Sequence, residues 1–185
     1  MNWKNTTQRY GRLQIGLHWL MLVLIAAVYA LMEFRGIFPK GSAGQDAMKH
    51  WHFMLGMLVF VLVILRIVVR WAMPHPRIEP PIPAWQTKLS SVVHVLLYLM
   101  MLGLPLAGWL MFSAAGKPVP FFGLELPPLI GQNKALAKQI KEVHEAVASI
   151  GYGLIGLHAV AALFHHYWMH DNTLLRMLPE RKSTR

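Results

Sequence analysis

The feature that most constrains the fold is a set of four long runs that lack Asp, Glu, Lys and Arg. They cover residues 13–32, 50–65, 89–116 and 146–170. A helix needs about 20 residues to cross about 30 Å of hydrocarbon, so three runs suffice alone and the second suffices if it continues past Arg66. The chain is 55% hydrophobic and only 14% charged, unlike an average soluble protein. We therefore predict an all-α integral membrane protein, with residues 1–185 forming one up-down bundle of four transmembrane helices, at about 13–33, 50–71, 88–114 and 141–169.

The first apolar run is predicted to stay in the mature protein. It is longer than the apolar core of a secretory signal and lacks a small-residue cleavage site, so we expect a retained helix. The chain has no cysteine, which excludes disulfides, thiolate-ligated iron–sulfur clusters and covalent haem attachment. Any redox centre must use other ligands.

The distribution of basic residues predicts the orientation in the membrane. Four spans place both termini on one side, and residues 73–85, with five prolines, form a linker on that side. That side collects eleven of the eighteen basic residues: Lys4, Arg9, Arg12, Arg66, Arg70, Arg77, Lys88, Arg176, Arg181, Lys182 and Arg185. The positive-inside rule therefore predicts cytoplasmic termini. Residues 34–49 and 117–141 would form the outer loops, the latter with a short amphipathic helix over residues 133–141.

The histidines form a pattern within the spans. His144 and His158 are 14 residues apart in the fourth run, which places them within about 40° of one helical face and about 21 Å apart along it. His52 would lie level with His144 near the outer side. His18 would lie level with His158 near the inner side, and His94 would lie a few residues into the third helix from that same side.

Two imidazoles at each of two membrane levels are the arrangement expected for two stacked haems, each iron held between two histidines. Such ligation suits electron transfer because it fills both axial positions. Two alternatives remain open on spacing alone: His50 in place of His52, and His94 in place of His18. Glycines that would let macrocycles or helices approach closely lie nearby, at Gly56, Gly151, Gly153 and Gly156.

Arg66 lies 14 residues after His52 and would project at the inner level, where haem propionates need a positive partner. A charged residue inside a membrane span is costly and is a functional candidate. The alternative is that Arg66 and Arg70 extend to the inner surface. His165, His166 and His170 could form a metal site by spacing, but we expect them at the membrane interface, and His75 in solvent.

Five segments carry a resemblance to a known family. They read RLQIGLHW, MEFRG, LRIVVR, VHEAVASIGYGLIGLH and HHYWMHDNTLLRMLP, and they occur in order between about Tyr10 and Pro179. With them the chain resembles the bacterial cytochrome b561 family, most closely its superoxide-oxidising members. The histidine framework alone is shared with cytochrome subunits of hydrogenases and formate dehydrogenases.

The resemblance implies two non-covalent b-type haems. By motif, His18 pairs with His158 as ligands to the iron on the cytoplasmic side, and His52 pairs with His144 on the periplasmic side. The implied enzyme is a superoxide:ubiquinone oxidoreductase of the bacterial inner membrane. It would oxidise superoxide to dioxygen outside and pass the electrons to ubiquinone, with protons taken up from inside.

Further residues follow from this reaction. Arg35, Lys49 and Lys117 are candidates for steering the superoxide anion at the outer surface. His94 and Ser91 are candidates for a quinone or proton site near the inner haem, because imidazole titrates near neutrality.

Two other classes of function compete with this interpretation. One is an electron conduit and membrane anchor for a partner dehydrogenase or hydrogenase, in which the outer basic surface docks a redox protein. The other is a metal or proton transporter, which the absence of an intramembrane carboxylate disfavours. In each case the surroundings are the lipid bilayer, and we expect no nucleic-acid partner.

Overall fold

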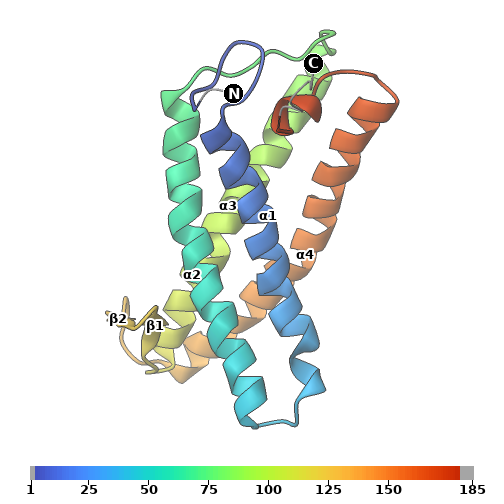
Figure 1. The fold of residues 1–185 in the computed structure, drawn as a ribbon. Coiled ribbons are helices and arrows are strands. Elements are labelled where there is room, and N and C mark those ends of the chain that lie inside the picture. The colour runs from blue at the N-terminus through green and yellow to red at the C-terminus, as the bar shows by residue number, and fades with distance from the viewer. Residues whose placement is uncertain (1–2, 180–185) are drawn as a thin grey trace.

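The computed structural model describes residues 3–179 and consists mainly of four long helices. These are α1 (Arg12–Glu33), α2 (Ala43–Ala72), α3 (Ala84–Ala114) and α4 (Lys134–Tyr167). Each is long and apolar enough to cross a membrane, as predicted. Figure 1 shows both chain ends at one end of the bundle, which we call the terminal end; the opposite end is called the far end. Arg181, Lys182 and Arg185 from the orientation argument lie outside the described residues.

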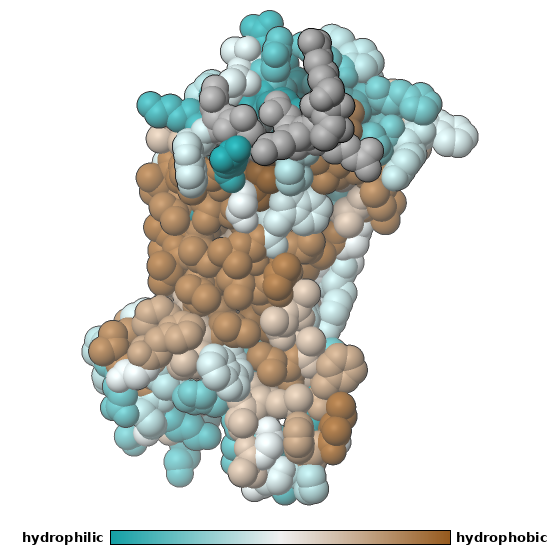
Figure 2. All heavy atoms as spheres, viewed as in Figure 1, coloured by the Kyte–Doolittle hydropathy of each residue, from teal (hydrophilic) through white to brown (hydrophobic). Residues whose placement is uncertain are grey.

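The surface shows the band that a bilayer requires. On the face seen in Figure 2, a hydrophobic band crosses the middle of the molecule, and hydrophilic residues gather toward the terminal and far ends. With four helices long and apolar enough to cross a bilayer, the described part of the chain is an integral membrane protein with four spans, since an exposed apolar band of this kind is unfavourable in water.

Two helices extend further beyond the apolar runs than the sequence predicts. α2 begins at Ala43, seven residues before the predicted start, because the Ser42 side chain accepts a hydrogen bond from the Gln45 backbone N–H. Asn133 caps α4 in the same way through the Leu136 N–H. The amphipathic segment expected over residues 133–141 is therefore the polar first part of α4 and continues directly into the span.

Short elements fill the connections. A 3-10 helix, η1 (Phe34–Ile37), follows α1, and a second, η2 (Leu175–Met177), follows α4. α3 ends at Ala114, and Gly116, two residues further on, has a φ of +67°, which is strained for other residues. Beyond it, β1 (Val119–Phe121) and β2 (Leu124–Leu126) form an antiparallel hairpin with Val119 opposite Leu126. The sequence analysis did not predict this hairpin.

The helices do not pack evenly. α1 packs against α2, α2 against α3, and α3 against α4, with a core cluster of Met21, Val59 and Val63 between α1 and α2. In the most apolar 18-residue window of each helix, 33% of α2 is buried but only 6% of α4. α4 therefore stands apart from α1 and α2, across the space that the histidines face.

Candidate functional site

Two histidine pairs lie between α4 and the helices opposite it. The His52 and His144 rings have centroids 6.3 Å apart toward the far end, and the His18 and His158 rings have centroids 6.2 Å apart toward the terminal end. His144 and His158 both come from α4, separated by about 21 Å of helix rise. The structure thus brings together the four histidines that sequence spacing and family resemblance combine into two pairs.

The ring separations fit one metal ion between each pair. Metal–imidazole bonds are about 2.0–2.1 Å long and a ring nitrogen lies about 1.1 Å from its centroid, so two rings on opposite sides of one iron have centroids about 6.2–6.4 Å apart. His94 also lies near His158, but its centroid is only 5.3 Å away. His50 is exposed, and its ring contacts Trp51. The distances thus favour His18 over His94, and the contacts favour His52 over His50.

The hydrogen bonds of the far-end pair also suit metal binding. Nδ1 of His52 lies 2.9 Å from the carbonyl oxygen of Val28 and can only donate to it, which leaves Nε2 unprotonated and able to bind a metal. Nδ1 of His144 is buried and forms no hydrogen bond of good geometry, although the Leu104 backbone lies close enough to interact with the ring. His52 is therefore the better oriented of the two.

Arg66 reaches the terminal-end pair. Its Nη2 lies 2.9 Å from Nδ1 of His18, while its Nε is buried without a hydrogen-bond partner. The arginine thus lies inside the span at the level of His18, where the 14-residue spacing from His52 predicts it. One unpaired N–H of the guanidinium remains available to an acceptor.

Of the two residues considered for a quinone or proton site, one lies next to the terminal-end pair. Nδ1 of His94 lies 3.3 Å from Oγ of Ser90. Ser91 instead donates a hydrogen bond to the Thr87 carbonyl of its own helix. The serine that contacts His94 is therefore Ser90 rather than Ser91.

The last histidines of α4 lie at the terminal end. His165 Nδ1 lies 2.5 Å from Oδ2 of Asp171. Burial raises the pKa of Asp171, but the hydrogen bonds from His165 and the Thr173 N–H outweigh burial and hold that pKa below its usual range. Among residues 3–179, no three His, Cys, Asp or Glu side chains are grouped to hold a metal ion.

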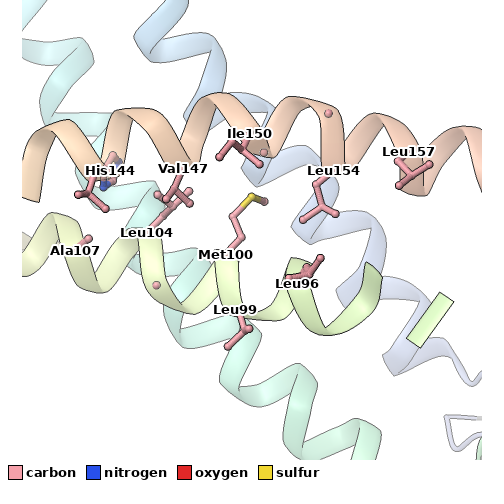
Figure 3. A pocket seen from close by; sticks show the side chains of 14 residues that line it. Leu96, Leu99, Met100, Leu104, Ala107, His144, Val147, Ile150, Leu154 and Leu157 are labelled. Carbon is pink, nitrogen blue, oxygen red and sulfur yellow. The ribbon is translucent and has the colours of Figure 1, made fainter. Parts of the chain in front are cut away.

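An apolar groove of about 570 Å³ runs along α3 and α4. Figure 3 shows His144 at one end of it and Leu96 and Leu157 at the other. Its lining contains no Asp, Glu, Lys or Arg. It therefore suits an apolar chain, and it ends beside the part of the bundle that holds His94 and His158.

Sequence reasoning missed the contacts that hold α1 and α4 together. Tyr29 Oη donates a hydrogen bond to the Ala148 carbonyl at 2.8 Å, and Tyr152 Oη donates to Oε1 of Glu33 at 2.7 Å. No periodic pattern marks these tyrosines, because single hydrogen bonds between distant helices leave no spacing signal. The only part of these contacts that the sequence marked was Glu33, which belongs to the MEFRG segment of the family resemblance.

Comparison with known proteins agrees with this geometry. The family described as "Prokaryotic cytochrome b561" matches residues 9–180. "Cytochrome b561 homolog 1" of Escherichia coli (strain K12) is 45% identical over 94% of this chain and 99% of its own length. "Probable superoxide oxidase CybB" of Yersinia pestis is 38% identical over 95% of this chain and 99% of its own, and "Cytochrome b562" of Cereibacter sphaeroides is 30% identical over 93% and 96%. The chain therefore belongs to the prokaryotic cytochrome b561 family of membrane electron-transfer proteins, which bind b-type haem.

Proposed function

We propose that this cytochrome is a di-haem superoxide:ubiquinone oxidoreductase. It oxidises superoxide to dioxygen at the far end and reduces ubiquinone at the terminal end. The observation that carries the proposal is the presence of two imidazole pairs, each spaced for one iron, at two membrane levels about 21 Å apart along α4. One centre would serve each side of the membrane.

His52 and His144 would hold the far-end haem, and His18 and His158 the terminal-end haem. A ligand that binds iron through Nε2 carries its proton on Nδ1, as His52 does toward Val28. His18 in that form could not accept from Arg66, which has only donors. The guanidinium would then be free to pair with a haem propionate, which is the role we propose for Arg66.

The overall reaction balances with one quinone for two superoxide ions. Each superoxide gives up one electron, and ubiquinone takes two electrons and two protons to become ubiquinol. Bound haem supplies the one-electron redox centres. The far end needs no catalytic base because superoxide loses only an electron. The terminal end must deliver protons, and His94, held by Ser90, is our candidate for hydrogen bonding the quinone or carrying a proton.

The groove offers the quinone a way in from the bilayer. Its walls are almost entirely aliphatic. At the terminal end of the groove, Leu96 lies two residues after His94 in the chain, and Leu157 directly precedes His158. An isoprenoid chain can lie in such a groove at no desolvation cost to polar groups. We therefore propose that the quinone approaches along α3.

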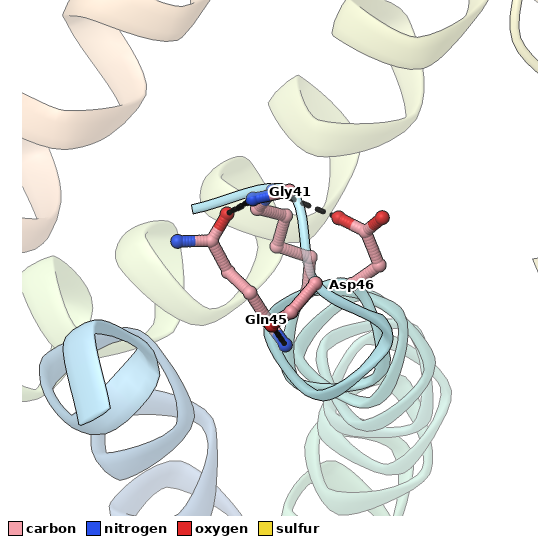
Figure 4. A network of polar contacts seen from close by, with 5 residues as sticks. Gly41, Gln45 and Asp46 are labelled. Atoms are coloured by element: carbon pink, nitrogen blue, oxygen red, sulfur yellow. Dashed lines mark hydrogen bonds and ion pairs between the residues drawn. The ribbon is translucent and has the colours of Figure 1, made fainter. Parts of the chain in front are cut away.

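The choice of superoxide is supported by the Yersinia pestis relative's name and by the charge at the far end. One of the three steering candidates, Lys49, is already held by Gln45 and Asp46, each with an oxygen 3.0 Å from its Nζ. Figure 4 labels both partners in this network of polar contacts. A neutralised cation attracts an anion weakly. Arg35 and Lys117 are therefore our preferred steering residues.

We further propose that the terminal end faces the cytoplasm of a bacterial cell. The positive-inside bias favours this orientation. It places superoxide oxidation in the periplasm and lets quinone reduction draw protons from the cytoplasm.

The decisive experiment mixes the purified cytochrome with superoxide in a stopped-flow spectrometer and then adds a ubiquinone. We expect haem reduction within milliseconds and reoxidation only when quinone is present. Arg35→Gln and Lys117→Gln should each slow reduction several-fold at low salt, while Lys49→Gln serves as the matched control with little effect. A haem that superoxide does not reduce, in a protein that copurifies with a dehydrogenase, would instead establish the electron-conduit function.

A further inference from the structure

A cluster between α1 and α4 has no part in binding iron. We call it the α1–α4 clamp, and it consists of Tyr29, Glu33, Gly151 and Tyr152. The Tyr29 and Tyr152 rings lie 4.5 Å apart between centroids, at an angle of 57°. Their hydroxyls point to opposite helices, Tyr29 to the Ala148 carbonyl on α4 and Tyr152 to Glu33 at the end of α1.

The clamp joins two helices that are otherwise poorly connected. α1 packs mainly on α2 and α4 mainly on α3, and α1 and α4 are not among the most closely packed helix pairs. Toward the far end, α1 carries Val28, the acceptor of His52, and α4 carries His144. The two tyrosine hydrogen bonds of the clamp link α1 and α4 directly in this region.

Gly151 makes the clamp possible. A Cβ added at this position would overlap Tyr29 Oη and lie 2.7 Å from Sδ of Met100, so these two side-chain ends would have to shift. By contrast, a Cβ at Gly153 would meet no atom within 4 Å. Of these two α4 glycines, Gly151 is the one against which side chains of α1 and α3 pack closely.

The clamp is connected to the far-end pair on both sides. The carbonyl oxygen of Val28, which precedes Tyr29 in the chain, accepts a hydrogen bond from Nδ1 of His52 at 2.9 Å. On α4, the acceptor of Tyr29 is Ala148, one helical turn after His144. A shift of this turn of α1 would therefore move the acceptor of His52 and, through Ala148, the turn of α4 that follows His144.

We propose that Tyr29, in the space left by Gly151, is a positioning residue for the far-end haem. It sets the separation of α1 from α4 and so the orientation of the two imidazoles. This inference rests on the proposed pairing of His52 with His144. Imidazole orientation and hydrogen bonding tune the potential and the spectrum of a bis-histidine haem, so a positioning role has a signature of its own.

The test compares the purified full-length holoprotein with Tyr29→Phe, Gly151→Ala, the double variant, and Gly153→Ala as a matched control. Electron paramagnetic resonance and a redox titration resolve the two haems. We expect Tyr29→Phe to keep both haems and shift the low-spin signal and potential of the far-end haem alone. Gly151→Ala should disturb that haem more strongly, and the double variant less than Gly151→Ala, because the hydroxyl that the new methyl group would strike is gone.

The outcomes separate this inference from the proposed function. A far-end signal unchanged by Tyr29→Phe, or equal shifts of both haems, would overturn it, as would a double variant more disturbed than Gly151→Ala. His52→Ala serves as the reference for the pairing itself. If His52→Ala retained both haems, the proposed ligands would be wrong whatever the tyrosine variants showed.

Discussion

The proposed ligand pairs can be tested by counting haems in a matrix of histidine variants. The structure places the His52 ring beside the His144 ring and the His18 ring beside the His158 ring. About 21 Å of helix separates the two proposed ligands on α4. Removal of one ligand should therefore empty one site and leave the other intact. Each single change to Ala is expected to reduce the haem content from two per chain to one.

Double variants give the sharper prediction. His52→Ala combined with His144→Ala affects a single site and should still leave one haem. His52→Ala combined with His158→Ala affects both sites and should leave none. The pyridine haemochrome assay, with protein concentration from quantitative amino-acid analysis, measures this ratio directly.

Two controls make the matrix specific. His50→Ala should retain two haems, since its exposed side chain contacts Trp51 rather than His144. His94→Ala should also retain two, because its 5.3 Å centroid distance from His158 is about 1 Å too short for an iron between the rings. A full haem content after His52→Ala, or complete loss from the same-site double variant, would refute the pairing.

Two further predictions concern the terminal end. Asp171→Asn removes a charged acceptor from His165 and should cost about 1.5–3 kcal/mol of stability near neutral pH. The folded pKa of Asp171 lies below its ordinary value of 3.8, so the difference in stability should persist above pH 3.8 and disappear as the pH falls through the lower folded value. Thermal unfolding measured from pH 2.5 to 7 tests this dependence. A stability difference that does not change with pH would contradict the assignment. Arg66→Gln removes a positive charge that lies roughly 7 Å from a metal bound to His18, so it should lower the potential of the terminal-end haem by up to about 100 mV in a redox titration, with an effective dielectric constant of about 20. An unchanged potential, with both haems present, would show that Arg66 does not act on that haem.

The sequence predicted the architecture well because its strongest signals are physical requirements of the bilayer. Uncharged runs near 20 residues must be helices, and a 14-residue spacing on one helix must put His144 and His158 on nearly the same face. The depth of each histidine from the ends of the runs places His52 level with His144 and His18 level with His158. Where the sequence left His50 and His94 as alternatives, the ring distances and exposures now favour His52 and His18, and the ligand assignment itself stays a prediction.

The parts that sequence could not predict depend on single contacts between distant segments. The first turns of α2 and α4 are polar, so hydropathy alone ended those helices too early, while the caps of Ser42 and Asn133 decide where they begin. Ser90 and Ser91 are indistinguishable by composition, and only the side-chain directions put Ser90 beside His94. The same applies to Tyr29, whose role depends on a helix 119 residues further along the chain.

The isolated position of α4 has a consequence for how the protein is made. α4 is synthesised after α1, α2 and α3, packs mainly on α3, and in the proposed pairing contributes one ligand to each haem. A chain that ends after α3 would have every other part of the bundle and could hold neither cofactor by two histidines. Insertion of this one helix would therefore complete both proposed centres in a single step.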